Sequence, residues 1–251
     1  AVGQGSWLRK AIEHDTLSSV LLYGPAGTGK TTLARIIAHT THAEFVEVSA
    51  ITGTVKDLRR EIEAAESRLL TAGRRTILFI DEIGEMDEML QNKLLKVLED
   101  KRAFFESAYY DHTDEKVPPY IRKLFEEGAP ADFVLIGATT RDASHINPAL
   151  RSRCAEIYFE PLTPKHIEEI VQNAAKKLKV EVAEEVVRLI SEYTTEGRKA
   201  INILADAYSL ALSRTKEGED VKISKADIYE VAQVSRLYRF GRKKASDTPA
   251  V

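Results

Sequence analysis

The apolar and polar positions along the chain alternate between two patterns. Short apolar or alternating runs predict strands, and they occur at residues 20–23, 44–49, 75–80, 133–140 and 156–159. Stretches with apolar residues three and four positions apart predict helices, and they occur at about residues 7–13, 32–38, 54–70 and 90–98. Because strands alternate with helices, we predict an α/β fold with a sheet wound by right-handed crossovers.

The pattern changes after residue 160. Thr163 is a suitable helix cap with Pro164 in the first turn, and the chain from there to Gln233 has a helical period. One break is expected at residues 217–220, followed by a new cap at Ser224. We therefore expect an αβα core at residues 1–160, an all-helical domain at 161–235 and a linker at 236–251. The chain begins with Ala1 and ends in this linker, so we expect a piece of a longer protein.

Composition and charge narrow the function classes. The chain has 251 residues, of which 43% are hydrophobic, so it can bury a sizeable core. Its net charge of −3 gives no global attraction to nucleic acid or to an anionic membrane. The single cysteine, Cys154, excludes an internal disulfide and fits a reducing compartment. Without a signal peptide or an apolar run of membrane length, we expect a cytoplasmic protein, and an anchor upstream of residue 1 is compatible with this.

A glycine-rich stretch joins the first predicted strand to the next helix. Glycines let the backbone turn sharply with its N–H groups inward, and the helix adds its positive N-terminal end. We therefore expect the loop to bind the phosphates of ATP, with Lys30 at the β- and γ-phosphates and the Thr31 hydroxyl on Mg²⁺. A glycine-rich turn without a ligand is the weaker interpretation, given this strand and helix. The predicted loop consists of Gly24, Pro25, Ala26, Gly27, Thr28, Gly29, Lys30 and Thr31.

Two carboxylates follow the predicted strand at residues 75–80. Asp81 is expected to join Thr31 in the Mg²⁺ shell, and Glu82 is expected to orient the attacking water. Phosphoryl transfer needs mainly positioning and charge neutralisation, which these groups supply. A strand-end turn capped by acids is the alternative, and the glycine loop disfavours it. Together the two motifs predict an ATPase.

The order of these motifs resembles the AAA+ family over nearly the whole chain. The resemblance implies a P-loop core with a parallel five-stranded sheet flanked by helices, a small helical lid, and a homo-oligomeric ring, expected to be a hexamer. Val2 and Gly3 resemble the segment that lines the adenine pocket in clamp-loader-like members. Thr140 matches the sensor 1 position, which contacts the γ-phosphate or the lytic water, and Thr139 is the alternative.

The same resemblance implies that two arginines contact the nucleotide. Residues 147–154, which end in Ser-Arg-Cys, are similar to the family's arginine-finger segment. Arg153 is the better match and Arg151 is the alternative. Such an arginine would act on the γ-phosphate of a neighbouring subunit. Arg198 lies where the family places sensor 2, the contact from the lid to the nucleotide.

Later parts of the chain resemble the ATPase module of bacterial Lon-like (B-type) ATP-dependent proteases. The similarity covers residues 93–100, 105–110 and 130–141 and includes an insertion at about 103–130. The last nine residues resemble the junction that leads into a Ser/Lys peptidase domain in those proteases. This resemblance implies a motor that unfolds protein substrates for a peptidase domain in the parent chain, whose catalytic residues lie outside these 251 residues.

One segment departs from the Lon-like pattern. Residues 49–59 resemble clamp-loader-like and replication-fork AAA+ proteins and lack the aromatic pore loop of Lon proteases. A DNA-acting ATPase of the clamp-loader or branch-migration type is therefore the alternative. A third hypothesis, a scaffold that only binds ATP, is disfavoured by the intact Lys30, Asp81, Glu82 and Arg153. Between the Lon-like and the DNA-acting interpretation we favour the Lon-like one. Its long insertion is harder to match by chance than a core motif that all branches share.

The remaining candidates have simpler interpretations. Aromatic residues in the insertion either pack together or face the pore, where Tyr109 and Tyr110 would grip substrate. His39 and His42 are three residues apart but lack a second pair of metal ligands, so we expect a solvated helix end. Cys154 is expected to be a small packing residue. The basic and aromatic positions of residues 236–244 are expected to be linker rather than a nucleic-acid-binding segment.

Overall fold

The structure is a computed structural model that describes residues 6–53, 55–103, 119, 122, 126–130, 133–216 and 220–237. Its contacts divide the chain into two compact units. One unit comprises residues 1–24 and 30–159, and the other comprises residues 25–29 and 160–251. The predicted adenine-pocket residues Val2 and Gly3 and the insertion tyrosines Tyr109 and Tyr110 lie outside the described residues.

The first unit contains a five-stranded sheet in which all strand pairs are parallel. Its order is β2-β3-β6-β1-β7. The strands are β1 (Val20–Tyr23), β2 (Glu44–Ser49), β3 (Thr76–Asp81), β6 (Phe133–Thr139) and β7 (Ala155–Tyr158). The predicted parallel α/β sheet is therefore confirmed. A separate antiparallel pair, β4 (Arg102–Ala103) with β5 (Ala129–Pro130), joins the two ends of the insertion.

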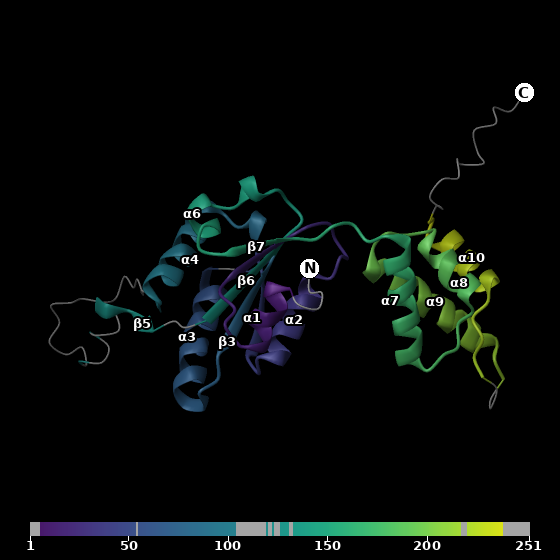
Figure 1. The fold of residues 1–251 in the computed structure, drawn as a ribbon, viewed down its shortest axis with the longest axis horizontal. Helices are drawn as coiled ribbons and strands as arrows, with labels where there is room; N and C mark the ends of the chain where they lie inside the picture. Colours follow the sequence, from purple (N-terminus) through teal and green to yellow (C-terminus); the bar gives the residue numbers. More distant parts are fainter. Residues whose placement is uncertain are drawn as a thin grey trace, which may run out of the picture. The chain divides into compact units, whose positions relative to one another are not determined.

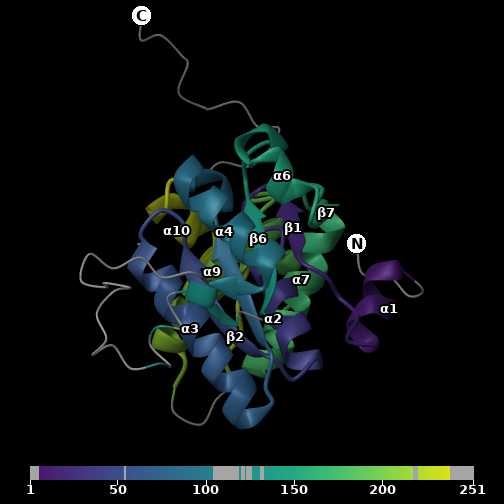
Figure 2. The same cartoon turned by 90° about the vertical axis from the view of Figure 1, so that its left-hand side faces the viewer.

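Helices cover both faces of this sheet (Figure 1). On one face α1 (Trp7–Glu13) and α2 (Lys30–Thr40) pack against Leu22 and Phe79. On the other face α3 (Val55–Ala72) and α4 (Glu88–Asp100) pack against Leu21 and Leu78. Figure 2 looks onto the α3 and α4 side. Because neighbouring strand residues point to opposite faces, each buried strand supplies both cores, which explains its continuous apolar sequence.

Short elements connect the larger ones on the α4 side. These are η1 (Ile83–Glu85), η2 (Ala143–His145) and α6 (Pro148–Arg151). The Asn147 side chain caps α6 by accepting a hydrogen bond from Ala149 N at 2.8 Å. Leu150 of α6 is fully buried in the core shared with α4. The segment that leads to Arg153 is therefore packed onto the sheet.

The two outer strands of the sheet, β2 and β7, carry ion pairs. On β2, Arg74 pairs with Glu44 at 2.9 Å and Arg35 pairs with Glu47 at 2.5 Å. On β7, Arg151 pairs with Glu156 at 2.5 Å. Charged side chains therefore flank both edges.

The second unit contains four helices within its described residues, α7 (Pro164–Leu178), α8 (Glu184–Ser191), α9 (Gly197–Arg214) and α10 (Lys225–Val234). Thr163 caps α7 and Ser224 caps α10, as predicted. The expectation of a single break was wrong, because residues 179–183 and 192–196 also interrupt the helices. Val182 pairs with Ile223 there, a distant contact that helical period cannot reveal. No helix in the described ranges is long and apolar enough to cross a membrane.

Candidate nucleotide site

The glycine loop between β1 and α2 has a backbone that only glycine adopts readily. Gly24, Gly27 and Gly29 have φ angles of 145°, 70° and 98°. A Cβ atom on Gly24 would lie 2.5 Å from the Phe159 carbonyl oxygen, so no side chain fits there. The Lys30 Nζ donates a hydrogen bond to the Gly24 carbonyl at 2.6 Å. The lysine therefore folds back to the first residue of the loop.

Lys30 is an unusually buried lysine, with 8% of its surface exposed. Burial lowers its pKa, while the charges of Glu82 and Asp81 act in the opposite direction. The ammonium group therefore interacts electrostatically with both carboxylates at the end of β3. A bound triphosphate would add negative charge at this place and favour the charged form of the lysine further.

Glu82 follows β3 in a left-handed conformation, with φ of 52° and ψ of 45°. Such conformations in residues other than glycine are concentrated at functional sites. Its Oε2 accepts hydrogen bonds from Thr140 N at 3.0 Å and from Thr140 Oγ1 at 3.1 Å. The Thr139 hydroxyl also reaches Oε2, at 3.5 Å. Both sensor 1 candidates thus meet the same carboxylate, and Thr140 makes the shorter contacts.

Thr31 and Asp81 are the predicted metal ligands. Thr31 is the second residue of α2, Asp81 ends β3, and α2 packs against that strand. Both residues are half-buried. The carboxyl end of a parallel sheet is the usual place for a ligand in α/β folds. One hydroxyl and one carboxylate suit Mg²⁺, which completes its shell with water and phosphate oxygens.

Arg151 is bound within its own chain by Glu156 of β7. The Arg151 Nε and Nη2 atoms donate to the Glu156 carboxylate at 2.5 Å and 3.3 Å. The hydroxyls of Tyr158 and Tyr23 donate to the same carboxylate at 3.0 Å and 3.3 Å. The hydrogen bond from Arg151 is the largest cause of a lowered pKa at Glu156. Arg151 is therefore part of a local network on the outer strand.

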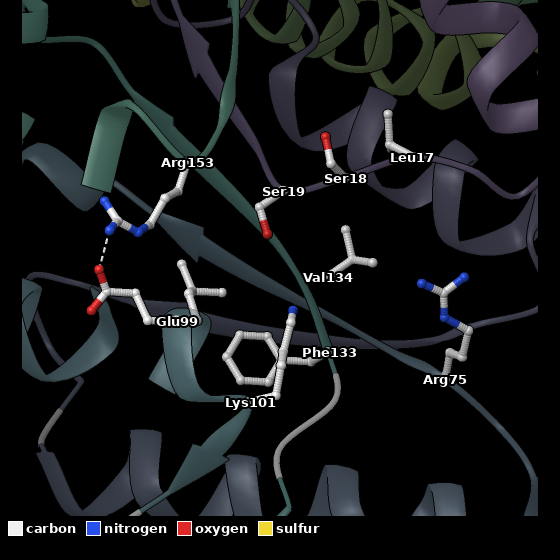
Figure 3. A pocket seen from close by; sticks show the side chains of 10 residues that line it. Leu17, Ser18, Ser19, Arg75, Glu99, Lys101, Phe133, Val134 and Arg153 are labelled. Atoms are coloured by element: carbon white, nitrogen blue, oxygen red, sulfur yellow. Dashed lines mark ion pairs between the residues drawn. The ribbon is translucent and has the colours of Figure 1, made fainter. Parts of the chain in front are cut away.

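Arg153 lies where the strands of the sheet begin, whereas the phosphate loop lies where they end. It forms an ion pair with Glu99 in the last turn of α4 and donates a hydrogen bond to the Ala149 carbonyl at 2.8 Å. It lines a cavity with Ser19, which precedes β1, and with Phe133, which begins β6 (Figure 3). The phosphate loop follows the other end of β1, and four residues of strand span about 13 Å.

Arg198 is the second residue of α9 and is exposed. The residue before it, Gly197, donates a backbone hydrogen bond to the Gly27 carbonyl at 3.1 Å. A Cβ atom on Gly27 would lie 3.0 Å from the Glu196 Cβ. The first turn of α9 therefore packs closely against the middle of the glycine loop.

Gln91, a buried residue of α4, is not among the residues predicted from the sequence. Its Nε2 donates to the His145 carbonyl at 3.1 Å, and its Oε1 accepts from Asn147 N at 2.7 Å. Gln91 therefore fixes the start of the segment that carries Arg153. The sequence did contain a signal, since a glutamine on the apolar face of a helix is unusual.

The remaining candidates show no sign of a second chemical site. In the described residues, no three histidine, cysteine or acidic side chains are placed to hold a metal, and this includes His39 and His42. Burial raises the pKa of Cys154 to about 11, so its thiol is protonated at neutral pH. Most of the basic tail, from residue 238 onward, lies outside the described residues.

Comparison with known proteins identifies the family. A family model described as "ATPase family associated with various cellular activities (AAA)" matches residues 20–162. The chain belongs to this AAA ATPase family. Membership supports nucleotide binding and ATP hydrolysis as the activity of the chain.

Curated relatives of this AAA chain fall into two groups. It is 35% identical to "Lon protease 2" of Bacillus subtilis (strain 168), over 97% of this chain and 49% of the relative. It is 32% identical to "Replication-associated recombination protein A" of Haemophilus influenzae, over 88% of this chain and 44% of the relative. The chain thus spans about half the length of the curated relatives it matches, or less.

Solved structures of Thermotoga maritima RuvB have a fold similar to that of this chain. One RuvB variant has a TM-score of 0.65 at 25% identity, over 90% of this chain and 66% of the other. The structure titled RuvB Holliday junction branch migration motor has a TM-score of 0.60 at 24% identity, over 90% of this chain and 65% of the other. These matches confirm the AAA+ P-loop fold.

Proposed function

We propose that this chain is the ATP-hydrolysing motor module of a Lon-like ATP-dependent protease. The observation that carries the enzymatic part is the Glu82 carboxylate, held by Thr140 beside Asp81 and the buried Lys30. In this arrangement Lys30 would bind the β- and γ-phosphates, and Thr31 and Asp81 would hold Mg²⁺. When bound, the metal would neutralise charge on the phosphates.

Glu82 would prepare the attacking water. The water oxygen forms a bond to the γ-phosphorus while the bond to the β-phosphate oxygen breaks, which yields ADP and inorganic phosphate. Glu82 would hold the water in line and accept its proton. The hydrogen bonds from Thr140 would fix the orientation of the carboxylate, and Lys30 would stabilise the charge that develops on the phosphates.

A neighbouring subunit would complete the site. Arg153 lies where the strands begin, at the opposite end of the sheet from its own phosphate loop. Arg151 is already bound to Glu156. A ring, which we propose to be a homohexamer, would bring Arg153 of one subunit to the γ-phosphate held by the next. Arg198 would contact the nucleotide from the helical unit, and Val2 and Gly3 would line the adenine pocket.

The Lon-like assignment is supported by the extent of the similarity. The alignment with "Lon protease 2" covers 97% of this chain, so few residues lie outside it. In this proposal the ring unfolds protein substrates, translocates them and delivers them to a Ser/Lys peptidase domain of the parent chain.

A DNA-acting motor is the second candidate. It is supported by the relative named "Replication-associated recombination protein A" and by residues 49–59, which lack an aromatic pore loop. Such a protein would use the same ATPase site to move along or remodel branched DNA.

The rate of ATP hydrolysis in the presence of each substrate class distinguishes the candidates. The protein is assayed alone, with an unfolded protein and with branched DNA, and Lys30→Ala serves as the inactive control. Stimulation by the unfolded protein supports the Lon-like motor, whereas stimulation by DNA alone supports the second candidate. Tight ATP binding without hydrolysis would contradict both and favour an assembly scaffold.

A further inference from the structure

The cavity around Arg153 contains an unusual set of charges (Figure 3). Its volume is about 350 Å³, and its lining includes the cations Arg75, Lys101 and Arg153. Among the described residues that line it, Glu99 is the one carboxylate. This excess of positive charge suits an anion. The Glu99 carboxylate already occupies part of that role.

The pairing of these charges is uneven. Glu99 forms an ion pair with Arg153, and both side chains are partly exposed, at 38% and 40%. Arg75 pairs with Asp15 at 3.0 Å. Lys101, which ends α4 in a left-handed conformation, has no ion-pair partner in the described part of the chain. A carboxylate of the same chain thus neutralises the arginine proposed to act on the neighbouring subunit, while a lysine that lines the same cavity is available.

We propose that Glu99 competes with the neighbouring subunit's nucleotide for Arg153. In an unassembled subunit Glu99 would hold the guanidinium, and the terminal phosphate of the neighbour's ATP would displace it on assembly. This inference rests on the proposed role of Arg153 in the ring. A carboxylate and a phosphate a few ångströms apart repel each other, so both anions cannot be bound equally well by one guanidinium. Lys101 lines the same cavity and offers Glu99 another partner.

The expected effect is moderate. Ion pairs between exposed side chains change an equilibrium by about 1.4- to 5-fold. Glu99 would therefore not block assembly, but it would raise the protein concentration at which neighbouring subunits activate each other. The contact would thereby restrict activation to protein concentrations at which neighbouring subunits meet often.

The test is the rate of ATP hydrolysis per subunit as a function of protein concentration, at saturating ATP. Glu99→Gln removes the charge with little change of shape and should lower the half-activating concentration about 1.4- to 5-fold. Glu99→Ala should shift it in the same direction. Asp100→Asn is the matched control, because it removes the same charge from the next residue of α4, which has no ion pair in the described residues. It should behave as the unmodified protein does.

Ionic strength supplies a second readout. The difference between Glu99→Gln and the unmodified protein should shrink as salt shortens the Debye length from about 30 Å to about 3 Å. A purely structural role of Glu99 would not produce this dependence.

Arg153→Ala separates the two levels of the hypothesis. If this variant hydrolyses ATP normally, Arg153 is not the trans-acting arginine and that part of the proposed function is wrong. If it is inactive, but Glu99→Gln matches Asp100→Asn or needs more protein than the unmodified chain, the competition alone is overturned.

Discussion

At the scale of single residues, Glu82 combines a strained backbone with the predicted catalytic carboxylate. Glu82→Gln should retain ATP affinity, because Lys30 and Asp81 are unchanged and an amide oxygen can still accept from Thr140. Hydrolysis should fall about 100-fold or more, because the amide cannot accept the proton of the water. Calorimetry measures the affinity, and phosphate release measures the turnover. Turnover close to that of the unmodified protein would rule out this role for Glu82.

Cys154 provides a test of the electrostatics at the end of the α6 segment. Burial is the main cause that raises its pKa from an ordinary value of 9.0 to about 11, with Glu156 adding to the effect. The folded protein should therefore contain about a hundredfold less thiolate below pH 9 than an ordinary thiol. Alkylation by iodoacetamide at pH 8 should be correspondingly slow and should accelerate about tenfold per pH unit. A rate equal to that of free cysteine would show that the thiol is exposed.

The same shift predicts how stability depends on pH. A raised folded-state pKa means that the unfolded thiol loses its proton first, so the contribution of Cys154 to stability is complete below about pH 9. It should be lost as the pH rises through about 11. A Cys154→Ser variant should lack this component of the stability profile.

At the scale of elements, the position of α6 depends on Gln91 of α4. Gln91→Ala should leave the His145 carbonyl and the Asn147 N–H without their side-chain partner. We expect a loss of stability of about 1–3 kcal/mol and slower hydrolysis, because the Arg153 segment is less well fixed. ATP affinity should not change, since Gln91 lies outside the phosphate loop.

A neighbouring residue supplies the control for this prediction. Asn92 accepts an exposed hydrogen bond from the Asn147 side chain at 2.7 Å, so Asn92→Ala should have little effect. Thermal unfolding and the hydrolysis rate are the measurements. Equal effects of the two variants would mean that burial at Gln91 is unimportant.

The strands and the phosphate loop could be predicted because their signals are local. The five strand runs agree with the structure to within one residue at each end, and β1 leads directly into the glycine loop. The missed features depend on distant contacts. Gln91 binds Asn147, which lies 56 positions later in the sequence, and Glu99 and Arg153 have a similar separation along the chain. Pairings of this kind arise from the order of strands in the sheet, which hydrophobic periodicity does not specify.

At the scale of the whole molecule, mixed rings test whether sites are shared between subunits. Arg153→Ala subunits keep an intact Glu82, and Glu82→Gln subunits keep an intact Arg153. Each variant alone should be nearly inactive, whereas a mixture should recover part of the activity. At some interfaces a complete pocket would meet a complete arginine.

Assembly must be verified in this experiment, for example by light scattering. Absence of recovery at every mixing ratio, with rings present, would indicate that the arginine acts within its own chain or that Arg151 is the finger. Recovery would exclude a site contained in one subunit.

The ion pairs on the two outer strands also bear on aggregation at high concentration. An outer strand exposes unpaired backbone groups to which a strand of another molecule can add, and repeated addition produces fibres. Here one outer strand, β7, is short, with four residues, and the other, β2, has six. A strand that added there would have to desolvate an ion pair, either Arg35 with Glu47 or Arg151 with Glu156, and this desolvation costs free energy. We therefore expect the folded molecule to resist strand addition at either outer strand, even when it is concentrated.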